Sequence, residues 1–286
     1  MTAIDIAALN QWIGRSREAE ELITPRLVEA YRATLTPHLA PVEAGEAPLA
    51  LHWCLAPELA PTGALGPDGH SLGSGFLPPV PLPRRMWAGG EVEILAPLRL
   101  GDRVTRQSTI ADIGLKGGRP GPLCFVTVRH ELATDRGVAI RERQDMVYRA
   151  AVAAGAAPAQ SPAPPAAETP QRADLIWRVE ATPVLLFRYC ALTFNGHRIH
   201  YDHPYATGVE GYPGLLVHGP LQATLLLNLA ASLGGRAPRN FSYRATAPLV
   251  AGQPFELHGR RDSAGAVGCW SADAAGSIAM RATATW

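Results

Sequence analysis

Apolar and polar residues alternate along two separate series of short segments, one in each half of the chain. Such alternation is the pattern of a strand that buries one face, and the turns at 116–118, 135–137 and 263–265, each containing glycine, separate segments. Because short turns reverse the chain, neighbouring segments are expected to pair antiparallel. The predicted strands are residues 103–113, 123–133 and 139–149 in the first half and 255–262, 267–272 and 278–286 in the second.

The second half also contains one long apolar segment that predicts a buried helix. Residues 220–233 begin with a proline and end at Gly234-Gly235, a natural C-terminal cap. The segment is apolar almost all round, so most of its faces must be buried. A shorter apolar and helix-like run, residues 184–194, precedes it.

A short sequence signature links the two halves. Residues 96–101, Ala-Pro-Leu-Arg-Leu-Gly, recur as residues 247–252, Ala-Pro-Leu-Val-Ala-Gly, at an offset of 151 residues, and each copy precedes its own series of predicted strands. We therefore expect an internal duplication. Long antiparallel strands wrapped round one buried helix form a hotdog, so the sequence predicts an α+β double hotdog, in which two antiparallel sheets each wrap round a central helix.

Residues 150–173 predict a boundary between the halves. Almost all of them are Ala, Pro, Gly, Gln, Ser or Thr, a composition that cannot bury a core and is typical of a semi-extended linker. The predicted domains are therefore residues 1–149 and residues 174–286.

Composition narrows the class of protein. With 286 residues, of which 47% are hydrophobic and 18% charged, the chain is long enough for two domains with sizeable cores. A net charge of +1 argues against nucleic-acid binding, which needs a clustered basic excess. The four cysteines form no CxxC pair, the N-terminus has no signal-peptide pattern, and no apolar run reaches the roughly 18 residues of a membrane span. We therefore expect a cytoplasmic protein with reduced thiols and no membrane partner.

Residues 195–200, Asn-Gly-His-Arg-Ile-His, form a polar loop that is the strongest candidate for chemistry. The loop follows the helix-like run, and a second polar turn, His218-Gly219-Pro220, opens the buried helix. A histidine supplies a proton-transfer group near neutral pH, and the start of a helix supplies free backbone N–H donors. This pairing suits the addition or removal of water beside a thioester carbonyl.

The offset of 151 residues carries residues 196–200 of this loop onto residues 45–49, Gly-Glu-Ala-Pro-Leu, where no group at the matching position can transfer a proton. The duplication is thus expected to have kept one chemical site, in the second half. The first half is expected to be a degenerate hotdog that shapes the pocket for the substrate.

The sequence of the loop resembles the MaoC-like, hydratase-2 group of (R)-specific enoyl-CoA hydratases, especially its double-hotdog members. The usual motif of that group is Asp-x-Asn-Pro-x-His-x-Asp. Residues 195–202 correspond to it, with Asn in place of the leading Asp, His-Arg in place of Asn-Pro, and the last two motif residues kept as His200 and Asp202. This departure, with residues 212–220 after it, resembles the subgroup that hydrates branched C5 dicarboxylyl-CoA esters, namely 3-methylfumaryl-CoA (mesaconyl-C4-CoA) and itaconyl-CoA.

The resemblance implies how the reaction would proceed. Asn195 and His200 would hold a water molecule over the C=C bond of an enoyl-CoA thioester. Asn195 can orient the water but cannot take its proton, which leaves His200 as the general base. The backbone N–H of Gly219 would stabilise the enolate. The family implies an acyl-CoA substrate and no cofactor beyond the CoA of that substrate.

Other residues are candidates for binding the acyl-CoA. Arginine pairs with phosphate and carboxylate groups bidentately, although each arginine taken singly could be a solvated surface residue. His218 could equally position the loop, and Arg198 could order it through backbone carbonyls. Trp53, Trp87 and Trp177 are expected in the core. The candidate contacts are Arg84 or Arg85 for the distal carboxylate of the acyl group, with Arg198, Tyr201, His218, Arg236 and Arg239.

Alternatives stay open for the metal content, the function and the assembly. His197, His200 and His203 recur every three residues, but no Cys or carboxylate cluster joins them, so no metal is expected. The alternatives to a hydratase are an acyl-CoA thioesterase and a non-catalytic protein that binds acyl thioesters. Exposed sheet edges commonly pair, so the chain is expected to be a monomer or a homodimer.

Overall fold

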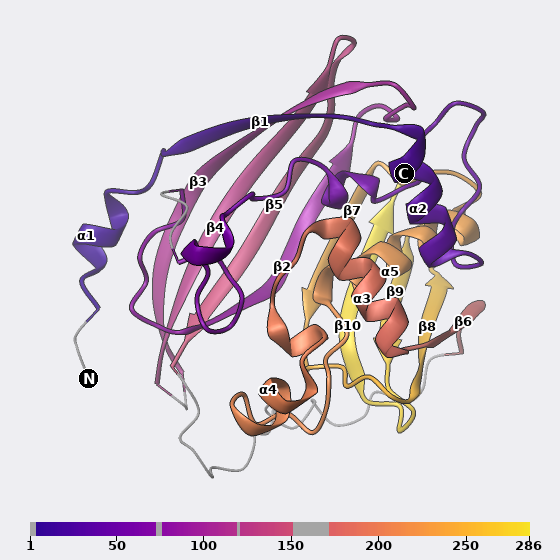
Figure 1. The fold of residues 1–286 in the computed structure, drawn as a ribbon. Coiled ribbons are helices and arrows are strands. Elements are labelled where there is room, and N and C mark those ends of the chain that lie inside the picture. Colours follow the sequence, from indigo (N-terminus) through magenta and orange to yellow (C-terminus); the bar gives the residue numbers. More distant parts are fainter. Residues whose placement is uncertain (1–3, 73–75, 119–120, 151–171) are drawn as a thin grey trace.

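A single ten-stranded antiparallel sheet organises the molecule (Figure 1). The computed structural model describes residues 4–72, 76–118, 121–150 and 172–286. The strands are β1 (Ser16–Leu22), β2 (Arg84–Ile94), β3 (Arg103–Gly118), β4 (Gly121–Thr134), β5 (Gly137–Arg149), β6 (Leu175–Glu180), β7 (Asn240–Ala245), β8 (Pro254–Arg261), β9 (Val267–Ala272) and β10 (Ile278–Thr285).

The order of the strands is symmetric about the pair β2–β7. The first half contributes β1-β3-β4-β5-β2, and the second half continues the sheet as β7-β10-β9-β8-β6. β2 and β7 pair antiparallel, with Gly89 opposite Arg244 at one end and Glu93 opposite Asn240 at the other. This arrangement confirms the predicted α+β double hotdog and agrees with an internal duplication. The sheet differs from the prediction in one respect: the two units share one continuous sheet instead of forming two separate sheets.

α5 (Gly219–Gly234) is the buried helix that the sequence predicts at residues 220–233. It ends at Gly235, whose φ of 80° is the left-handed conformation of a C-terminal cap. The helix packs against β8, β9 and β10, and every residue from Leu221 to Ala231 is buried. Its first residues point toward the junction between the halves, where the candidate chemistry lies.

The other helices are short. α2 (Pro25–Leu35) and α3 (Pro183–Thr193) lie side by side and begin alike, with a threonine cap followed by proline (Figure 1). Their first residues, Pro25 and Pro183, are 158 residues apart, because the first half has seven more residues than the second between this helix and the Ala-Pro-Leu signature. The remaining elements are α1 (Ile6–Asn10), α4 (His203–Gly208) and the 3-10 turns η1 (Leu51–Cys54), η2 (Thr62–Ala64) and η3 (Arg198–His200).

The offset between α2 and α3 changes which first-half segment corresponds to the loop at residues 195–200. Residues 37–42, and not residues 45–49, follow the equivalent helix. The predicted counterpart was therefore wrong. Pro37 and Val42 occupy the positions of the asparagine and of the second histidine of the loop, and neither side chain can transfer a proton.

The first half has no counterpart of α5 among the described residues, since only η1 and η2 lie between α2 and β2. The prediction of a central helix in each unit was wrong for this half. The inner face of its sheet gives the reason. The strands under α5 carry buried apolar residues, whereas the matching positions of the first half carry charged or amide side chains. A helix packed on these side chains would remove them from water, which costs free energy. The pairs matched by strand register are Leu257 with Arg106, Ala282 with Glu142, and Ala284 with Gln144.

The predicted linker at residues 150–173 falls almost entirely on residues 151–171, which lie outside the described residues. β5 ends at Arg149 and β6 begins at Leu175, next to the predicted limits of the two domains. Among the residues that the structure describes, no helix is long and apolar enough to cross a membrane.

Gly90 in β2 allows the close approach of the two halves. A Cβ at this position would overlap the carbonyl oxygen of Arg143 and the hydroxyl of Tyr243. We predict that Gly90→Ala lowers the free energy of unfolding by about 2 kcal/mol, because backbone and ring must both shift. Gly114→Ala in β3 is the matched control, since nothing lies within 4 Å of that Cβ. Urea unfolding measures both variants, and equal stabilities would contradict this account of the junction.

Candidate active site

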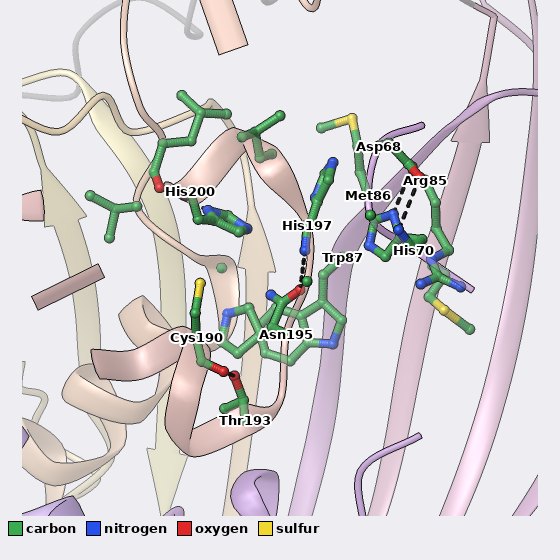
Figure 2. Close-up of a pocket in the computed structure, with 18 of the residues that line it drawn as sticks. Asp68, His70, Arg85, Met86, Trp87, Cys190, Thr193, Asn195, His197 and His200 are labelled. Carbon is green, nitrogen blue, oxygen red and sulfur yellow. Dashed lines mark hydrogen bonds and ion pairs between the residues drawn. The ribbon is translucent and has the colours of Figure 1, made fainter. Parts of the chain in front are cut away.

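A pocket of about 980 Å³ opens between the two halves. The first half lines it with Trp53, His70 and Arg85, and the second half with Asn195, His200 and the start of α5. Figure 2 shows His70 and Arg85 on one side of the pocket and Asn195 and His200 on the other. The candidate chemical groups of the second half therefore face side chains of the first half.

The loop at residues 195–200 is held in place by its own hydrogen bonds. α3 ends at Phe194, whose φ of 50° is left-handed and turns the chain into the pocket. The Oδ1 atom of Asn195 accepts a hydrogen bond from the N–H of His197 at 2.9 Å. No partner is recorded among the described residues for the NH₂ group of Asn195, so this group can donate to a ligand.

Arg198 orders the loop. Its guanidinium forms an ion pair with Asp202 at 2.7 Å and donates to the carbonyl of Pro67 in the first half at 2.8 Å. Tyr201 lines the pocket and donates its hydroxyl to the carbonyl of Gly196 at 2.9 Å. Of the two predicted contacts, Tyr201 thus lies at the pocket, whereas Arg198 is engaged by the protein.

His200 presents a neutral base to the pocket. The side chain is only 8% exposed, and its Nδ1 atom lies 2.8 Å from the carbonyl oxygen of Leu216. A carbonyl can only accept, so Nδ1 carries the proton and Nε2 is the basic nitrogen. Burial lowers the pKa of His200 to about 4, which keeps the ring neutral near pH 7.

The start of α5 lies against His200. The ring of His218 stacks on that of His200 with 3.6 Å between centroids, and its Nε2 atom lies 3.1 Å from the Sγ atom of Cys190. Gly219 is the first residue of the helix, where a backbone N–H has no intrahelical acceptor. A Cβ on Gly219 would lie 2.9 Å from the ring of Trp87, so glycine is required for this contact. His218 therefore packs beside the base, and Gly219 offers a donor.

The sequence analysis missed a histidine of the first half. The Nδ1 atom of His70 lies 2.8 Å from Oδ2 of Asp68, and its ring lies 4.1 Å from that of His197 (Figure 2). The ring of His197 in turn meets that of His200 edge-on at 5.4 Å. Together with His218, four imidazole rings form a continuous row. The Asp-Gly-His turn is visible in the sequence, but nothing there indicates that it reaches the loop of the other half.

The two loops meet through their backbones. A Cβ on Gly69 would overlap the carbonyl group of Gly196, and a Cβ on Gly196 would lie 2.8 Å from the carbonyl oxygen of Gly69. The N–H of Arg198 donates to the carbonyl of Asp68 at 2.9 Å. Glycine at both positions is therefore what allows Asp68 and His70 to reach the second half.

Asp68, His70 and His197 offer polar atoms that all lie within 4.8 Å of one another, a spacing that a metal ion could use. Two observations favour a different role. Asp68 and His70 already satisfy each other through a hydrogen bond. The positive charge of Arg85 lies close enough to act on both histidines, whose pKa values are lowered first by burial and further by this charge. A second cation would be repelled by Arg85, so the cluster suits an anion better.

The structure separates the predicted arginines. Arg84 forms a buried ion pair with Glu210 at 2.6 Å and is therefore already neutralised. Arg85, the next residue of β2, lines the pocket and has no ion pair recorded among the described residues. Arg236 and Arg239 follow the C-terminal end of α5 and line a separate pocket of about 440 Å³. The structure does not bring these two to the catalytic loop, which lies at the other end of the helix.

The tryptophans have two different environments. Trp53 and Trp87 pack on the core as expected, but they also line the pocket. Trp53 donates its Nε1–H to the buried carboxylate of Glu142 at 2.7 Å. Trp177 packs on the core away from the pocket, with its ring 5.6 Å from that of His38.

Comparisons with known proteins agree with this geometry. The profile described as hydroxyacyl-thioester dehydratase type 2 matches residues 50–251. The mesaconyl-C4-CoA hydratase of Chloroflexus aurantiacus is 45% identical over 251 residues, which cover 87% of this chain and 88% of that relative. A solved MaoC-like dehydratase, at 16% identity and a TM-score of 0.72, covers 98% of this chain and 100% of its own. The structure of HtdX of Mycobacterium tuberculosis, at 20% identity and a TM-score of 0.67, covers 95% of this chain and 100% of its own. These two structures show the fold alone.

The family profile and the relative at 45% identity show a hydro-lyase of acyl thioesters, and the buried histidine beside the start of the central helix agrees with that class. The chain belongs to the hydroxyacyl-thioester dehydratase type 2 family. The resemblance to the MaoC-like hydratases that the loop indicated is thereby confirmed.

The row of four histidines, of which His200 and His218 are buried and the other two half-buried, predicts a loss of stability in acid. Burial lowers the pKa of His200 to about 4 and that of His197 to about 2, and it lowers the pKa of His218 as well. In the unfolded chain each ring has a pKa of about 6.5. As the pH falls below that value, the unfolded state binds more protons than the folded state, so the free energy of unfolding decreases. We expect a loss of about 1.4 kcal/mol per pH unit for each such histidine.

Urea unfolding between pH 7 and pH 5 measures this slope. His218→Asn is expected to reduce it by about 1.4 kcal/mol per pH unit. His203→Asn, at an exposed position, is the control and should leave the slope of the wild-type protein unchanged. A slope that is the same in all three proteins would show that His218 is not held neutral by the fold.

Proposed function

We propose that the protein adds water to the C=C bond of a branched C5 dicarboxylyl-CoA thioester, mesaconyl-C4-CoA or itaconyl-CoA, and forms citramalyl-CoA. One observation carries the proposal: a neutral His200 with a fixed tautomer lies beside Asn195 and the start of α5 in a single pocket. The relationship to mesaconyl-C4-CoA hydratase supports the choice of acyl group.

The reaction begins with a water molecule held between Asn195 and His200. The NH₂ group of Asn195 donates to the water oxygen and orients it, while Nε2 of His200 accepts one of the water protons. The oxygen forms a bond to the β-carbon of the enoyl thioester. In mesaconyl-C4-CoA the C=C bond is conjugated with the thioester, so its electron pair moves toward the thioester carbonyl, whose oxygen gains negative charge, and His200 becomes an imidazolium ion. In itaconyl-CoA the C=C bond lies one carbon further from the carbonyl, so this enolate step applies to the mesaconyl ester.

The second part of the reaction returns the proton. The N–H of Gly219 stabilises the enolate oxygen, a contribution that is typically worth about 10²–10³ in rate. The imidazolium of His200 is a strong acid, because burial holds its pKa at about 4. It gives the proton to the α-carbon, and the carbonyl reforms. The elements of one water are then added and His200 is again neutral, so no cofactor beyond the CoA of the substrate is needed.

The proposal includes the division of labour and the location that the sequence predicts. The second half supplies His200, Asn195 and Gly219, while the first half shapes the pocket. Cys54, Cys124, Cys190 and Cys269 are free and buried, as expected of thiols in a reducing compartment, which supports a cytoplasmic location. A monomer and a homodimer both fit this scheme, because the pocket lies within one chain.

Substitution of the base tests the proposal directly. Wild-type protein should convert mesaconyl-C4-CoA to a product with the mass of one added water, with loss of enoyl absorbance and without release of free thiol. His200→Ala should lower kcat by about 10³-fold, because no other group accepts the water proton. His203→Ala is the matched control and should keep its activity, since that residue is exposed on α4.

The same assay separates the alternatives. Release of free thiol by the wild-type protein would indicate a thioesterase. Binding without turnover would indicate a non-catalytic protein. A His200→Ala variant with normal kcat would contradict the mechanism.

Asn195 provides a second test, which concerns the orientation of the water. Asn195→Ala should lower kcat by about 10²-fold, the usual effect of losing one positioned polar group. Asn195→Asp restores the residue of the wider family and can still accept from the N–H of His197, so it should keep more activity than the alanine variant. Steady-state kinetics measure both, and an unaffected Asn195→Ala enzyme would mean that another group holds the water.

A further inference from the structure

The part of the pocket around His70 belongs to the first half and has no role in the mechanism above. It consists of the hydrogen-bonded pair Asp68–His70 and of Arg85 on β2 (Figure 2). Arg85 is half-buried, and a half-buried cation without an ion pair favours an anionic ligand. Whether this charge is free for a ligand depends on the partners of the arginines in the pocket.

The other arginines that line the pocket are already engaged. Arg84 pairs with Glu210. Arg106 donates to the carbonyl of Leu55 at 3.2 Å, and Arg149 donates to the hydroxyl of Tyr212 at 3.2 Å. Arg85 lies beside the hydroxyl of Tyr148, which is a neutral partner, and it forms no ion pair among the described residues, so its charge remains available to a ligand.

The chemistry of the proposed substrate limits where its free carboxylate can lie. In mesaconyl-C4-CoA and in itaconyl-CoA the carboxylate is attached to the carbon that receives the hydroxyl group. It must therefore lie one bond away from the carbon that faces the water on Asn195 and His200. His197 lies between His200 and His70, with ring centroids 5.4 Å from the first and 4.1 Å from the second, so the part of the pocket that holds His70 and Arg85 adjoins the loop that holds the water. On this side of the pocket Arg85 and His70 are the groups that can pair with the carboxylate.

We propose that Arg85 and His70, the latter oriented by Asp68, form the subsite that binds the free carboxylate of the acyl group. The inference rests on the proposed function and adds the residues that select the substrate. The half of the chain that has lost its central helix thereby supplies the specificity of the reaction.

The hydrogen bond to Asp68 fits His70 for this role. Asp68 accepts from Nδ1, so Nε2 is the atom that remains for a ligand, and it donates when the ring is protonated. The groups that act on His70 are Asp68 and Glu58, which favour the charged ring, and burial and Arg85, which oppose it. A bound carboxylate would shift this balance toward the charged ring and would neutralise Arg85.

The test compares two substrates that differ in one group. Mesaconyl-C4-CoA carries a carboxylate where 3-methylcrotonyl-CoA carries a methyl group. Arg85→Gln should lower kcat/KM for mesaconyl-C4-CoA by about 100-fold and that for 3-methylcrotonyl-CoA by less than about threefold, because only the first substrate loses a charged partner. His70→Asn should change the same ratio in the same direction. Arg129→Gln, an exposed residue on β4, removes the same charge away from the pocket and should change neither value.

Binding of saturated analogues keeps this inference separate from the proposed function. Calorimetric titration with 3-methylsuccinyl-CoA, whose free carboxylate lies beside the methyl group, and with 3-methylbutyryl-CoA needs no turnover. Wild-type protein should bind the first more tightly, and Arg85→Gln should remove the preference. Equal affinities in the wild-type protein would overturn the subsite even if hydration is observed. Absence of turnover with a normal carboxylate preference would overturn the proposed function alone.

Two other outcomes would overturn the subsite. The first is an equal loss of activity on both substrates in Arg85→Gln and His70→Asn, which would assign these residues to the reaction itself. The second is a stoichiometric metal ion in the purified wild-type protein that His70→Asn loses, which would assign the cluster to a cation.

Discussion

The structure depends on where one apolar helix can be buried. α5 fits against β8, β9 and β10 because the strands below it present small or apolar residues such as Leu257, Ala282 and Ala284. The register-matched positions of the first half carry Arg106, Glu142 and Gln144, which cannot lie under an apolar helix at low cost. One half of the sheet is therefore covered by a helix, and the other half carries charged and amide side chains such as Arg106 and Gln144 at the edge of the pocket.

Burial of α5 also fixes the positions of the groups at the start of the helix. Because α5 is held on most of its faces, its first turn is a rigid edge of the pocket, with Gly219 against Trp87 and His218 stacked on His200. The base is held neutral by the same burial, and its tautomer is set by the carbonyl of Leu216. In the proposed mechanism the site thus combines a fixed acceptor for the water proton with a fixed donor for the enolate.

The first half brings Asp68 and His70 to the pocket through a backbone contact between two loops. Gly69 and Gly196 bring two loops together at a distance that side chains would prevent, and Asp68 and His70 are carried on that contact. The pocket is consequently a property of the whole chain. The two units have matching strand orders, and the unit without a central helix among the described residues leaves room for the pocket at their junction.

Local patterns were sufficient to predict several parts of this arrangement. Alternating residues predicted the strands of both meanders, the apolar run at residues 220–233 predicted α5, and the loop at residues 195–200 predicted the family. The first-half counterpart of the loop at residues 195–200 was misplaced because the offset was measured at the Ala-Pro-Leu signature. The first half has seven more residues than the second between α2 or α3 and that signature, so the offset is larger at the loop.

Long-range contacts could not be predicted in the same way. The partner of Arg84 lies 126 residues away at Glu210, and His70 meets His197 across the two halves, so neither contact leaves a periodic signal. The missing helix could have been suspected, because Glu142 and Gln144 fall on the inward positions of a predicted strand.

The most direct test of the account is the number of acyl-CoA molecules that one chain binds. The central claim is that two similar units build one site at their junction, in a pocket where the candidate chemical groups of the second half face side chains of the first half. Calorimetric titration of the full chain with a saturated acyl-CoA measures this number without turnover. The account predicts one molecule per chain, and two equivalent sites per chain would contradict it.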